Sequence, residues 1–251
     1  MKALGIIPAR YASSRFPGKP LADIAGKPMI QRVYEQACKA QLTKVVIATD
    51  DERIAEAGRA FGGEVLMTSA NHPSGTDRCQ EACAKVDEDF DVVVNIQGDE
   101  PFIQPGQVNN LIGCFEDRNT QIATLVKRAE RTADLFNPNR VKVLLNQRMD
   151  AMYFSRAPLP YRNGIEASEW LKDHVYFLHI GMYAYRPHIL EEITRLAPSS
   201  LEKAEQLEQL RWLEHGYRIR TAETDLESDS IDHPDDLRRM LERYREGDYG
   251  Y

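Results

Sequence analysis

Short apolar runs alternate with amphipathic segments through the first half of the chain. The expected strands span residues 3–8, 44–49, 64–67 and 91–97, and each is rich in Val or Ile where it is most apolar. Apolar residues recur at helical spacing in the segments 29–40, 51–61 and 77–85. Such alternation predicts an α/β fold of Rossmann-like type, with a mostly parallel central sheet flanked by helices on both faces.

The second half of the chain has a less regular pattern that mixes strands and helices. The expected strands span residues 122–126, 141–145, 151–155 and 178–185, and the expected helices span 187–197 and 201–215. A last helix should open at Pro234, a favoured first helical residue, behind the acidic Asp232. No linker or internal repeat interrupts the chain, so we expect one domain in which the second half extends the same sheet.

Composition narrows the class of protein. The chain has 251 residues, 42% of them hydrophobic and 28% charged, which is ordinary for a folded globular protein. A formal net charge of −7 argues against a nucleic-acid partner, because phosphate contacts call for a basic face. No apolar run is long enough to span a membrane and no signal peptide is visible, so we expect a cytoplasmic protein with no membrane insertion.

The loop after the first strand, residues 8–20, concentrates positive charge. In open α/β sheets, the loops at the carboxyl ends of strands form the ligand crevice. This loop contains no acidic residue, and its candidate phosphate ligands are three cations and the small donors around them: Arg10, Arg15, Lys19, Ser13, Ser14 and Gly18. It matches neither a Walker A loop nor a GxGxxG turn. A solvated basic loop is the alternative interpretation.

Two further motifs follow expected strands. The apolar run at residues 92–96 is followed by Gln97, Gly98, Asp99 and Glu100, which would bring hard oxygen ligands for Mg²⁺ to the same crevice unless they only form a turn. The segment 72–78, HPSGTDR, reads as a turn that enters a helix. Its Arg78 could hydrogen-bond a base or a phosphate, and a simple helix cap with a surface arginine is the alternative.

Seven segments together resemble one enzyme family. They are the loop 8–20, SGTDR at 74–78, NIQGDEP at 95–101, YFSRA at 153–157, HIGMYAYR at 179–186, LEQLR at 207–211 and IDHPDDL at 231–237. Each motif alone is weak, but their order and spacing along nearly the whole chain are specific. The set resembles the 3-deoxy-manno-octulosonate cytidylyltransferases, which join the CMP part of CTP to the acidic sugar Kdo and release pyrophosphate.

The resemblance implies a nucleotide-diphospho-sugar transferase fold, a Mg²⁺ cofactor, a homodimer and a role in lipopolysaccharide biosynthesis. Residues 1–115 would mainly bind nucleotide, and residues 116–251 would mainly bind the sugar and form the dimer. The implied CTP ligands are Pro8, Ala9, Arg10, Ser13, Arg15, Lys19, Ser74 and Arg78. The implied catalytic residues are Arg10, Arg15, Lys19, Asp99 and Asp232, of which Asp99 and Asp232 would ligate magnesium. The implied sugar ligands are Gln97, Arg156, His179, Glu208 and Gln209.

Some of these residues have ordinary structural interpretations as well. The family usually has a threonine where this chain has His233, and we interpret His233 as a helix-start residue rather than a metal ligand. Glu202, Glu205 and Glu208 are three apart and would usually form a solvated stripe on a helix. The aromatic side chains at 153, 154, 183 and 185 are expected to pack in the sheet.

Two other functions remain open at the level of sequence. One is a cytidylyltransferase for a related acidic sugar, such as 8-amino-Kdo or a sialic acid, because the sugar-facing residues would decide between them. The other is a non-catalytic regulatory protein that only binds CTP. Acidic residues at both Asp99 and Asp232 argue against the second, since a binder does not need both metal ligands.

Overall fold

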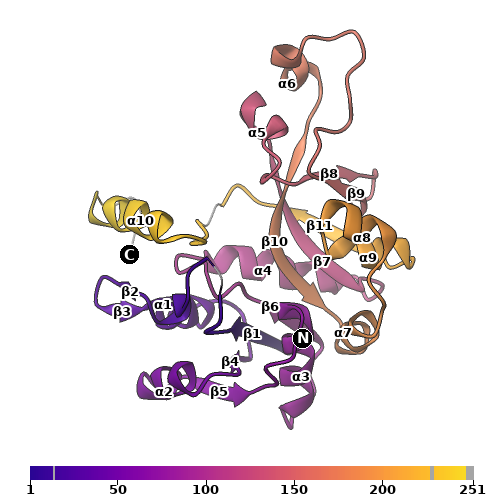
Figure 1. Ribbon diagram of the computed structural model, residues 1–251. Helices are drawn as coiled ribbons and strands as arrows, with labels where there is room; N and C mark the ends of the chain where they lie inside the picture. The colour runs from indigo at the N-terminus through magenta and orange to yellow at the C-terminus, as the bar shows by residue number, and fades with distance from the viewer. Residues whose placement is uncertain (14, 227–228, 247–251) are drawn as a thin grey trace. The chain divides into compact units, whose positions relative to one another are not determined.

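The structure is a computed structural model that describes residues 1–13, 15–226 and 229–246 (Figure 1). Ser14, which the sequence places among the phosphate ligands, lies outside these residues. The chain forms two compact units, one of residues 1–112 together with 226 onward and one of residues 113–225. The first boundary lies close to the expected division at residue 115. Residues from 226 onward belong with the N-terminal unit, although the sequence places them in the second half.

The N-terminal unit is built on four parallel strands. In spatial order they are β6 (Val92–Asn95), β1 (Ala3–Ala9), β4 (Lys44–Thr49) and β5 (Glu64–Met67). Every residue of β6 is buried, and all of β1 except Pro8 is buried, because helices cover both faces of the sheet. The sheet and its flanking helices confirm the predicted fold class.

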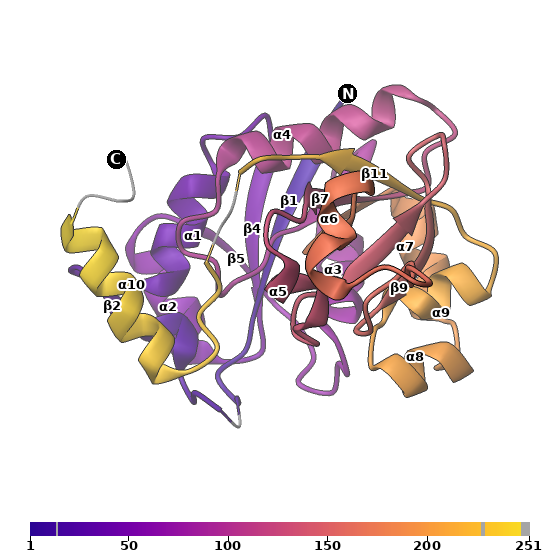
Figure 2. The same cartoon turned by 90° about the horizontal axis from the view of Figure 1, so that it is seen from above.

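The path of the chain explains which helix covers which face. The chain moves outward from β1 to β4 to β5 through α1 (Met29–Ala37) and α2 (Glu52–Ala60), and then returns to β6 through α3 (Gly75–Lys85). Right-handed crossovers therefore place α1 and α2 on one face and α3 on the other (Figure 2). The sequence anticipated these three helices to within a few residues at their ends. It did not anticipate α4 (Pro105–Gly113).

The C-terminal helix packs onto the N-terminal unit. Helix α10 (Pro234–Glu246) opens at Pro234 as expected. Ile231 and Met240 are buried in one apolar cluster with Ile24, Met29 and Phe102. Ile24 belongs to a short hairpin of β2 (Asp23–Ile24) and β3 (Lys27–Pro28), which follows the 3₁₀ helix η1 (Lys19–Leu21). This cluster anchors the segment that carries Asp232.

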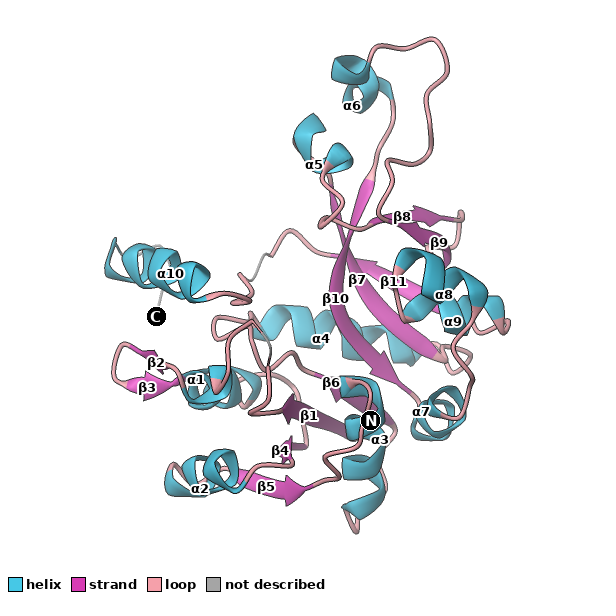
Figure 3. Cartoon of the chain, viewed as in Figure 1, coloured by secondary structure: helices cyan, strands magenta, loops and turns pink. Residues whose placement is uncertain are grey.

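The second unit contains a mixed sheet (Figure 3). Strand β10 (Phe177–Tyr185) runs antiparallel to β7 (Ile122–Arg128), and β11 (Ile219–Glu223) runs parallel to β7. The hairpin of β8 (Lys142–Leu145) and β9 (Ala151–Ser155) pairs with β10 through β8. The helical elements are η2 (Cys114–Glu116), α5 (Thr132–Phe136), η3 (Ala167–Glu169), α6 (Trp170–Asp173), α7 (Pro187–Thr194), α8 (Ser200–Glu205) and α9 (Gln209–Glu214). Strand β11 and helices α5 and α6 were not predicted.

The helix predicted at residues 201–215 was wrong, because the chain breaks between α8 and α9. Gln206 has a left-handed backbone (φ 53°, ψ 49°), and the Arg156 guanidinium binds the carbonyl oxygens of Glu205 and Gln206 at 2.8 and 3.3 Å. These carbonyls therefore have a side-chain donor where a continuous helix would use its own backbone. Arg156 comes from a distant segment, so local spacing could not predict the break.

The predicted solvated stripe was wrong for the same region. Glu202 accepts hydrogen bonds from Arg211 Nε at 2.7 Å and from the Ser199 N–H at 3.1 Å. Glu205 accepts from Ser155 Oγ at 2.6 Å and from the Arg156 N–H at 3.0 Å. Both carboxylates thus tie helix α8 to other elements. The expected aromatic packing is confirmed for Phe154, Tyr183 and Tyr185, which are buried.

None of the described helices is both long enough and apolar enough to cross a membrane.

Candidate active site

A cavity of about 240 Å³ lies in the N-terminal unit, at the carboxyl ends of β1 and β6. It is lined by the loop after β1, the turn before α3, the loop after β6 and the segment before α10: Pro8, Ala9, Arg10, Ser13, Arg15, Lys19, Pro20, His72, Pro73, Ser74, Gly75, Arg78, Gln97, Gly98, Asp99 and Asp232. The predicted juxtaposition of Arg15 and Asp99 is confirmed. Parallel strand ends meet at one edge, so loops far apart in sequence form one pocket.

The loop after β1 has a defined shape around Gly18. The Gly18 N–H donates to the Tyr11 carbonyl at 2.9 Å, and Gly18 has φ 70°, with the Tyr11 ring where a side chain would be. A residue with a Cβ would be strained there both by the backbone and by the ring. The Arg53 guanidinium lies 3.3 Å from the centroid of that ring. This closed loop delivers Lys19 to the pocket at the start of η1.

Gly98 lets the loop after β6 approach the loop after β1. A Cβ at Gly98 would lie 2.8 Å from the Pro8 carbonyl oxygen, closer than packed atoms tolerate. The two backbones therefore touch only because residue 98 is glycine. This contact places Asp99 directly beside Lys19 of the first loop.

Lys19 is the centre of the polar contacts in the pocket. Its Nζ lies 2.7 Å from Asp99 Oδ2, 2.8 Å from the Ile231 carbonyl oxygen and 3.7 Å from Asp232 Oδ1. The Ile231 N–H donates to the Asp99 carbonyl at 2.9 Å, which fixes the last segment of the chain against the loop after β6. Arg15 forms an ion pair with Asp232 at 2.9 Å. Two aspartates separated by about half of the chain thus converge on one cation.

These oxygens are suited to a hard divalent cation. Mg²⁺ prefers oxygen ligands and commonly takes one or two protein carboxylates, with phosphate and water completing the shell. Asp99 Oδ2, Asp232 Oδ1 and the Ile231 carbonyl already surround a positive charge, that of Lys19. Among the residues that the structure describes, no cluster of three or more acidic, histidine or cysteine side chains offers an all-protein metal cage. The donor set therefore fits a metal that the nucleotide helps to hold.

The turn before α3 contributes a helix cap and a buried arginine. The Ser74 hydroxyl accepts from the Asp77 N–H at 3.2 Å and donates to the Asp77 carboxylate at 2.6 Å, so the cap interpretation is confirmed. Arg78 is only 4% exposed, so the surface-arginine interpretation was wrong. Its guanidinium donates to Thr68 Oγ1 at 2.6 Å and lies 3.3 Å from the Asp50 carboxylate.

His72 lines the pocket, although nothing in the sequence beyond its place in the HPSGTDR motif assigned it a role. Its Nε2 contacts the Glu81 carboxylate on α3. Glu81 also accepts from Lys85 Nζ at 2.6 Å and from the Ser69 N–H at 2.9 Å. Burial alone would raise the pKa of Glu81, but these hydrogen bonds outweigh it and hold the pKa at about 2. The turn is therefore held on α3 by a charged carboxylate.

The predicted sugar ligands are divided between the two units. Gln97 lines the pocket, and Arg156, His179, Glu208 and Gln209 belong to the second unit. Arg156 uses its guanidinium on backbone carbonyls, including that of Pro138 at 3.0 Å. His179 contacts Thr124 Oγ1 at 2.9 Å, and burial lowers the pKa of His179 to about 3, so its imidazole is neutral at ordinary pH. Glu208 and Gln209 lie at the start of α9.

His233 is exposed, and its N–H donates to Asp236 at 2.8 Å at the start of α10, as expected of a helix-start residue.

Fold and pocket together define an α/β protein in which a cationic loop meets two carboxylates at the carboxyl ends of parallel strands. The chain belongs to the cytidylyltransferase family, whose profile matches residues 4–219. A Parabacteroides distasonis protein named 3-deoxy-manno-octulosonate cytidylyltransferase is 59% identical over 245 residues, which are 96% of this chain and 97% of that protein. A Bacteroides thetaiotaomicron protein of the same name is also 59% identical, over 96% of this chain and 98% of its own.

A solved structure gives the same assignment. The chain is similar to CMP:2-keto-3-deoxy-manno-octonic acid synthetase complexed with CTP, with a TM-score of 0.91 and 42% identity over 98% of this chain and 99% of that one. This similarity confirms the expected resemblance and the expected nucleotide-diphospho-sugar transferase fold.

Proposed function

We propose that this chain activates 3-deoxy-D-manno-octulosonate (Kdo) with CTP to give CMP-Kdo and pyrophosphate. The observation that carries the proposal is the pocket, which Arg10, Arg15 and Lys19 line together with Asp99 and Asp232. The names of relatives that match nearly the whole chain supply the substrates. The structure of a relative with CTP supports the nucleotide.

The reaction is an in-line attack of the anomeric hydroxyl of the sugar on the α-phosphorus of CTP. The anomeric oxygen bonds to that phosphorus, the bond from phosphorus to the bridging oxygen breaks, pyrophosphate leaves and the hydroxyl loses its proton to water. Such transfers depend on positioning and on neutralising charge rather than on covalent help from the protein. Arg10, Arg15 and Lys19 would bind the triphosphate and stabilise the charge that moves onto pyrophosphate.

We propose Mg²⁺ as the cofactor, held by Asp99 and Asp232. When bound, the ion would neutralise phosphate charge and make the α-phosphorus more electrophilic. Lys19 and Arg15 each contact one of these carboxylates, so both cations would change partners when phosphate enters. The Ile231 backbone would keep Asp232 close to Asp99 during that exchange, because the Ile231 N–H bonds to the Asp99 carbonyl.

The sugar acid would be bound by Gln97 together with Arg156, His179, Glu208 and Gln209. His179 is neutral, as its lowered pKa of about 3 indicates, so it would serve as a hydrogen-bonding group for sugar hydroxyls rather than as a cation. The Arg156 fork matches a carboxylate, but its present partners are backbone carbonyls. Binding a carboxylate would require at least one of these bonds to be exchanged.

We also propose a homodimer, formed through an exposed apolar surface on the second unit. Three large exposed side chains belong to residues that contact the buried Trp170: the rings of Phe136 and Tyr161 lie against it, and the Ile165 carbonyl accepts from its Nε1–H. Exposed apolar side chains gathered in this way mark an interaction site, and a second copy of the chain is the partner that the family resemblance favours. Light scattering should give a dimer for the wild type and a monomer for Tyr161→Asp. A monomeric wild type would contradict the proposal.

The function is tested by pyrophosphate release with CTP, UTP, ATP and GTP against Kdo, 8-amino-Kdo and a sialic acid. We expect turnover with CTP and Kdo, dependent on Mg²⁺. Turnover with another sugar acid and none with Kdo would show that the proposed sugar substrate is wrong. Tight CTP binding without turnover would favour a regulatory protein that only binds CTP. We expect the reaction in the cytoplasm, where CTP is made, and its product would serve lipopolysaccharide biosynthesis.

A further inference from the structure

Two neighbouring strands end beside the buried arginine of the pocket. Strands β4 and β5 are parallel and pair Thr49 with Met67, so the next residues, Asp50 and Thr68, emerge side by side at the carboxyl edge. The Thr68 N–H donates to the Thr49 carbonyl at 2.8 Å, which extends the pairing by one residue. Neither Asp50 nor Thr68 lines the cavity.

Arg78 joins these strand ends to the pocket. Its guanidinium donates to Thr68 Oγ1 at 2.6 Å and pairs with Asp50 Oδ1 at 3.3 Å. The side chain of Arg78 is 5% exposed and that of Asp50 is 17% exposed. A buried guanidinium loses much of its hydration, so it is retained only when fixed partners compensate for that loss. The two partners therefore fix the direction in which the remaining N–H groups point.

A guanidinium has donors and no acceptor. A ligand group that meets the free N–H groups of Arg78 inside the pocket must therefore supply acceptors. Cytosine offers two neighbouring acceptors, the carbonyl O2 and the unprotonated N3. Uracil offers O2, but its N3 carries a hydrogen that would face the donors of Arg78. A fixed arginine would bind the first edge and reject the second, because a buried donor facing a donor leaves both unsatisfied.

We infer that Asp50 and Thr68 are positioning residues, which hold Arg78 so that it reads the acceptor edge of the base and sets the preference for CTP over UTP. The inference rests on the proposed function, since it assumes that the base end of the nucleotide lies against Arg78. Asp50 and Thr68 would act only by holding Arg78 and would not contact the substrate. Their loss should therefore change the choice of nucleotide more than the maximal rate.

The test uses variants that differ by one functional group. Thr68→Val removes the hydroxyl and keeps the shape of the side chain, and Thr68→Ser keeps the hydroxyl. Asp50→Asn removes the charge that faces Arg78. The ratio of kcat/KM for CTP to kcat/KM for UTP should fall about tenfold in Thr68→Val and in Asp50→Asn, as expected for one hydrogen bond to a charged group. Thr68→Ser should keep the wild-type ratio.

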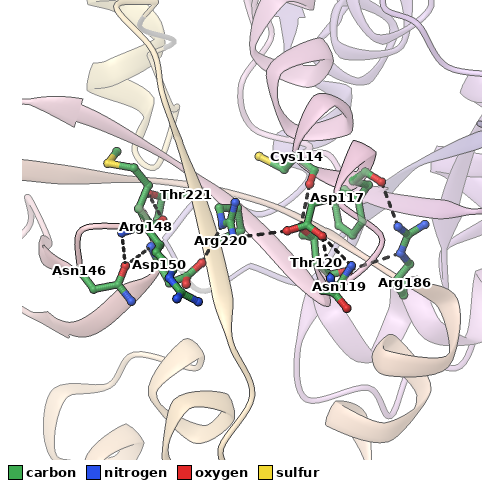
Figure 4. Close-up of polar contacts among 12 residues, drawn as sticks. Cys114, Asp117, Asn119, Thr120, Asn146, Arg148, Asp150, Arg186, Arg220 and Thr221 are labelled. Carbon is green, nitrogen blue, oxygen red and sulfur yellow. Dashed lines mark hydrogen bonds and ion pairs between the residues drawn. The ribbon is translucent and has the colours of Figure 1, made fainter.

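A matched control comes from the second unit, where Asp150 forms a comparable ion pair with an arginine (Figure 4). Asp150 is 9% exposed and accepts from Arg220 Nε at 2.7 Å. Asp150→Asn should lower the melting temperature, as any broken buried pair does, and leave the CTP to UTP ratio unchanged.

The outcomes separate the inference from the proposed function. If Thr68→Val and Asp50→Asn lose stability like Asp150→Asn and keep the wild-type nucleotide ratio, the positioning role is overturned. If the wild type itself releases pyrophosphate with neither nucleotide, the proposed function fails instead. In that case, direct titration of CTP and of UTP into the same variants still measures their binding preference. A ratio of the two dissociation constants that is the same in the variants as in the wild type would overturn the positioning role.

Discussion

Lys19 and Arg15 are already engaged with carboxylates, so their charge is shared between the protein and any anion that enters the pocket. Lys19 Nζ lies 2.7 Å from Asp99, and Arg15 lies 2.9 Å from Asp232. The side chain of Lys19 is 15% exposed, whereas that of Arg15 is 58% exposed. Lys19 is therefore the better shielded of the two cations, and its interaction with phosphate should be less weakened by salt.

Lys19→Ala and Arg15→Ala should each cripple turnover and leave the fold intact. A lost charge-assisted phosphate contact costs about 1.5 to 3 kcal/mol, which lowers kcat/KM for CTP by about 10-fold to 100-fold. Steady-state pyrophosphate release at subsaturating CTP measures the loss, and circular dichroism checks the fold. Lys27→Ala is the control, because Lys27 pairs with Glu35 away from the pocket. Wild-type activity in either variant would show that the substituted residue does not bind the triphosphate.

The charge pattern of the sequence predicted the cations of the pocket loop, but it did not predict the residues that hold Arg78 in place. Arg10, Arg15 and Lys19 stand out because an acid-free loop follows a strand in a chain of net charge −7. Asp50 and Thr68 had a signal too, since each directly follows a strand of the parallel sheet. Their role depends on the position of Arg78, which residue types alone do not specify.

At the level of elements, the turn before α3 is held by Glu81, whose pKa of about 2 lies below the ordinary 4.5. A carboxylate with a depressed pKa adds stability that is full above about pH 4.5 and is lost as the pH falls toward 2. Glu81→Gln should therefore destabilise the protein by about 1 to 3 kcal/mol near pH 6 and by little near pH 2. Urea unfolding at several pH values measures the difference.

A variant of a partner residue provides the control for that prediction. Lys85 supplies one of the hydrogen bonds to Glu81, so Lys85→Met should reproduce part of the loss near pH 6. If the difference between Glu81→Gln and wild type stayed constant from pH 6 to pH 2, the carboxylate would not be the group that holds the turn.

Helix α8 begins with a capping box, in which Ser199 Oγ accepts from the Glu202 N–H and the Glu202 carboxylate accepts from the Ser199 N–H. Ser199→Ala should lower the free energy of unfolding by about 1 kcal/mol. Thr194→Ala in α7 is the matched control, because the Thr194 hydroxyl only bonds back to carbonyls of its own helix, and its loss should be nearly neutral. If both variants lost the same free energy of unfolding, the capping box would add no stability beyond that of an ordinary helical hydroxyl.

The elements divide into those that local pattern specifies and those that distant contacts specify. Strands β4 and β5 were predicted with their observed ends. For β4 the reason is that a strand covered on both faces requires a continuous short apolar run. The break at Gln206 and strand β11 escaped prediction. The first depends on Arg156, and the second is a short strand with alternate polar residues whose place is defined by pairing with β7.

On the scale of the whole molecule, the N-terminal unit is discontinuous in sequence, since it contains residues 1–112 and the segment from 226 onward. Asp99 comes from the first part and Asp232 from the second. We predict that Asp99→Asn and Asp232→Asn each abolish most Mg²⁺-dependent turnover. The double variant should lose less than the sum of the two, because either loss disables the same ion.

A magnesium titration of both single variants and the double variant measures this coupling. Asp229→Asn is the control, because Asp229 pairs with Arg243 outside the pocket lining. Strictly additive losses would place the two aspartates on separate ions, and wild-type magnesium dependence in Asp232→Asn would remove that residue from the site.

Because the N-terminal unit is discontinuous in sequence, its pocket can be completed only late in the synthesis of the chain. A ribosome makes Lys19 early, whereas Ile231, whose carbonyl binds the Lys19 ammonium, follows 212 positions later. A growing chain therefore carries the phosphate loop, and then the whole second unit, before the segment that supplies Asp232 exists. A polypeptide released before Ile231 by a premature stop would lack both the carbonyl that binds Lys19 and the Asp232 carboxylate. We expect such a polypeptide to release no pyrophosphate.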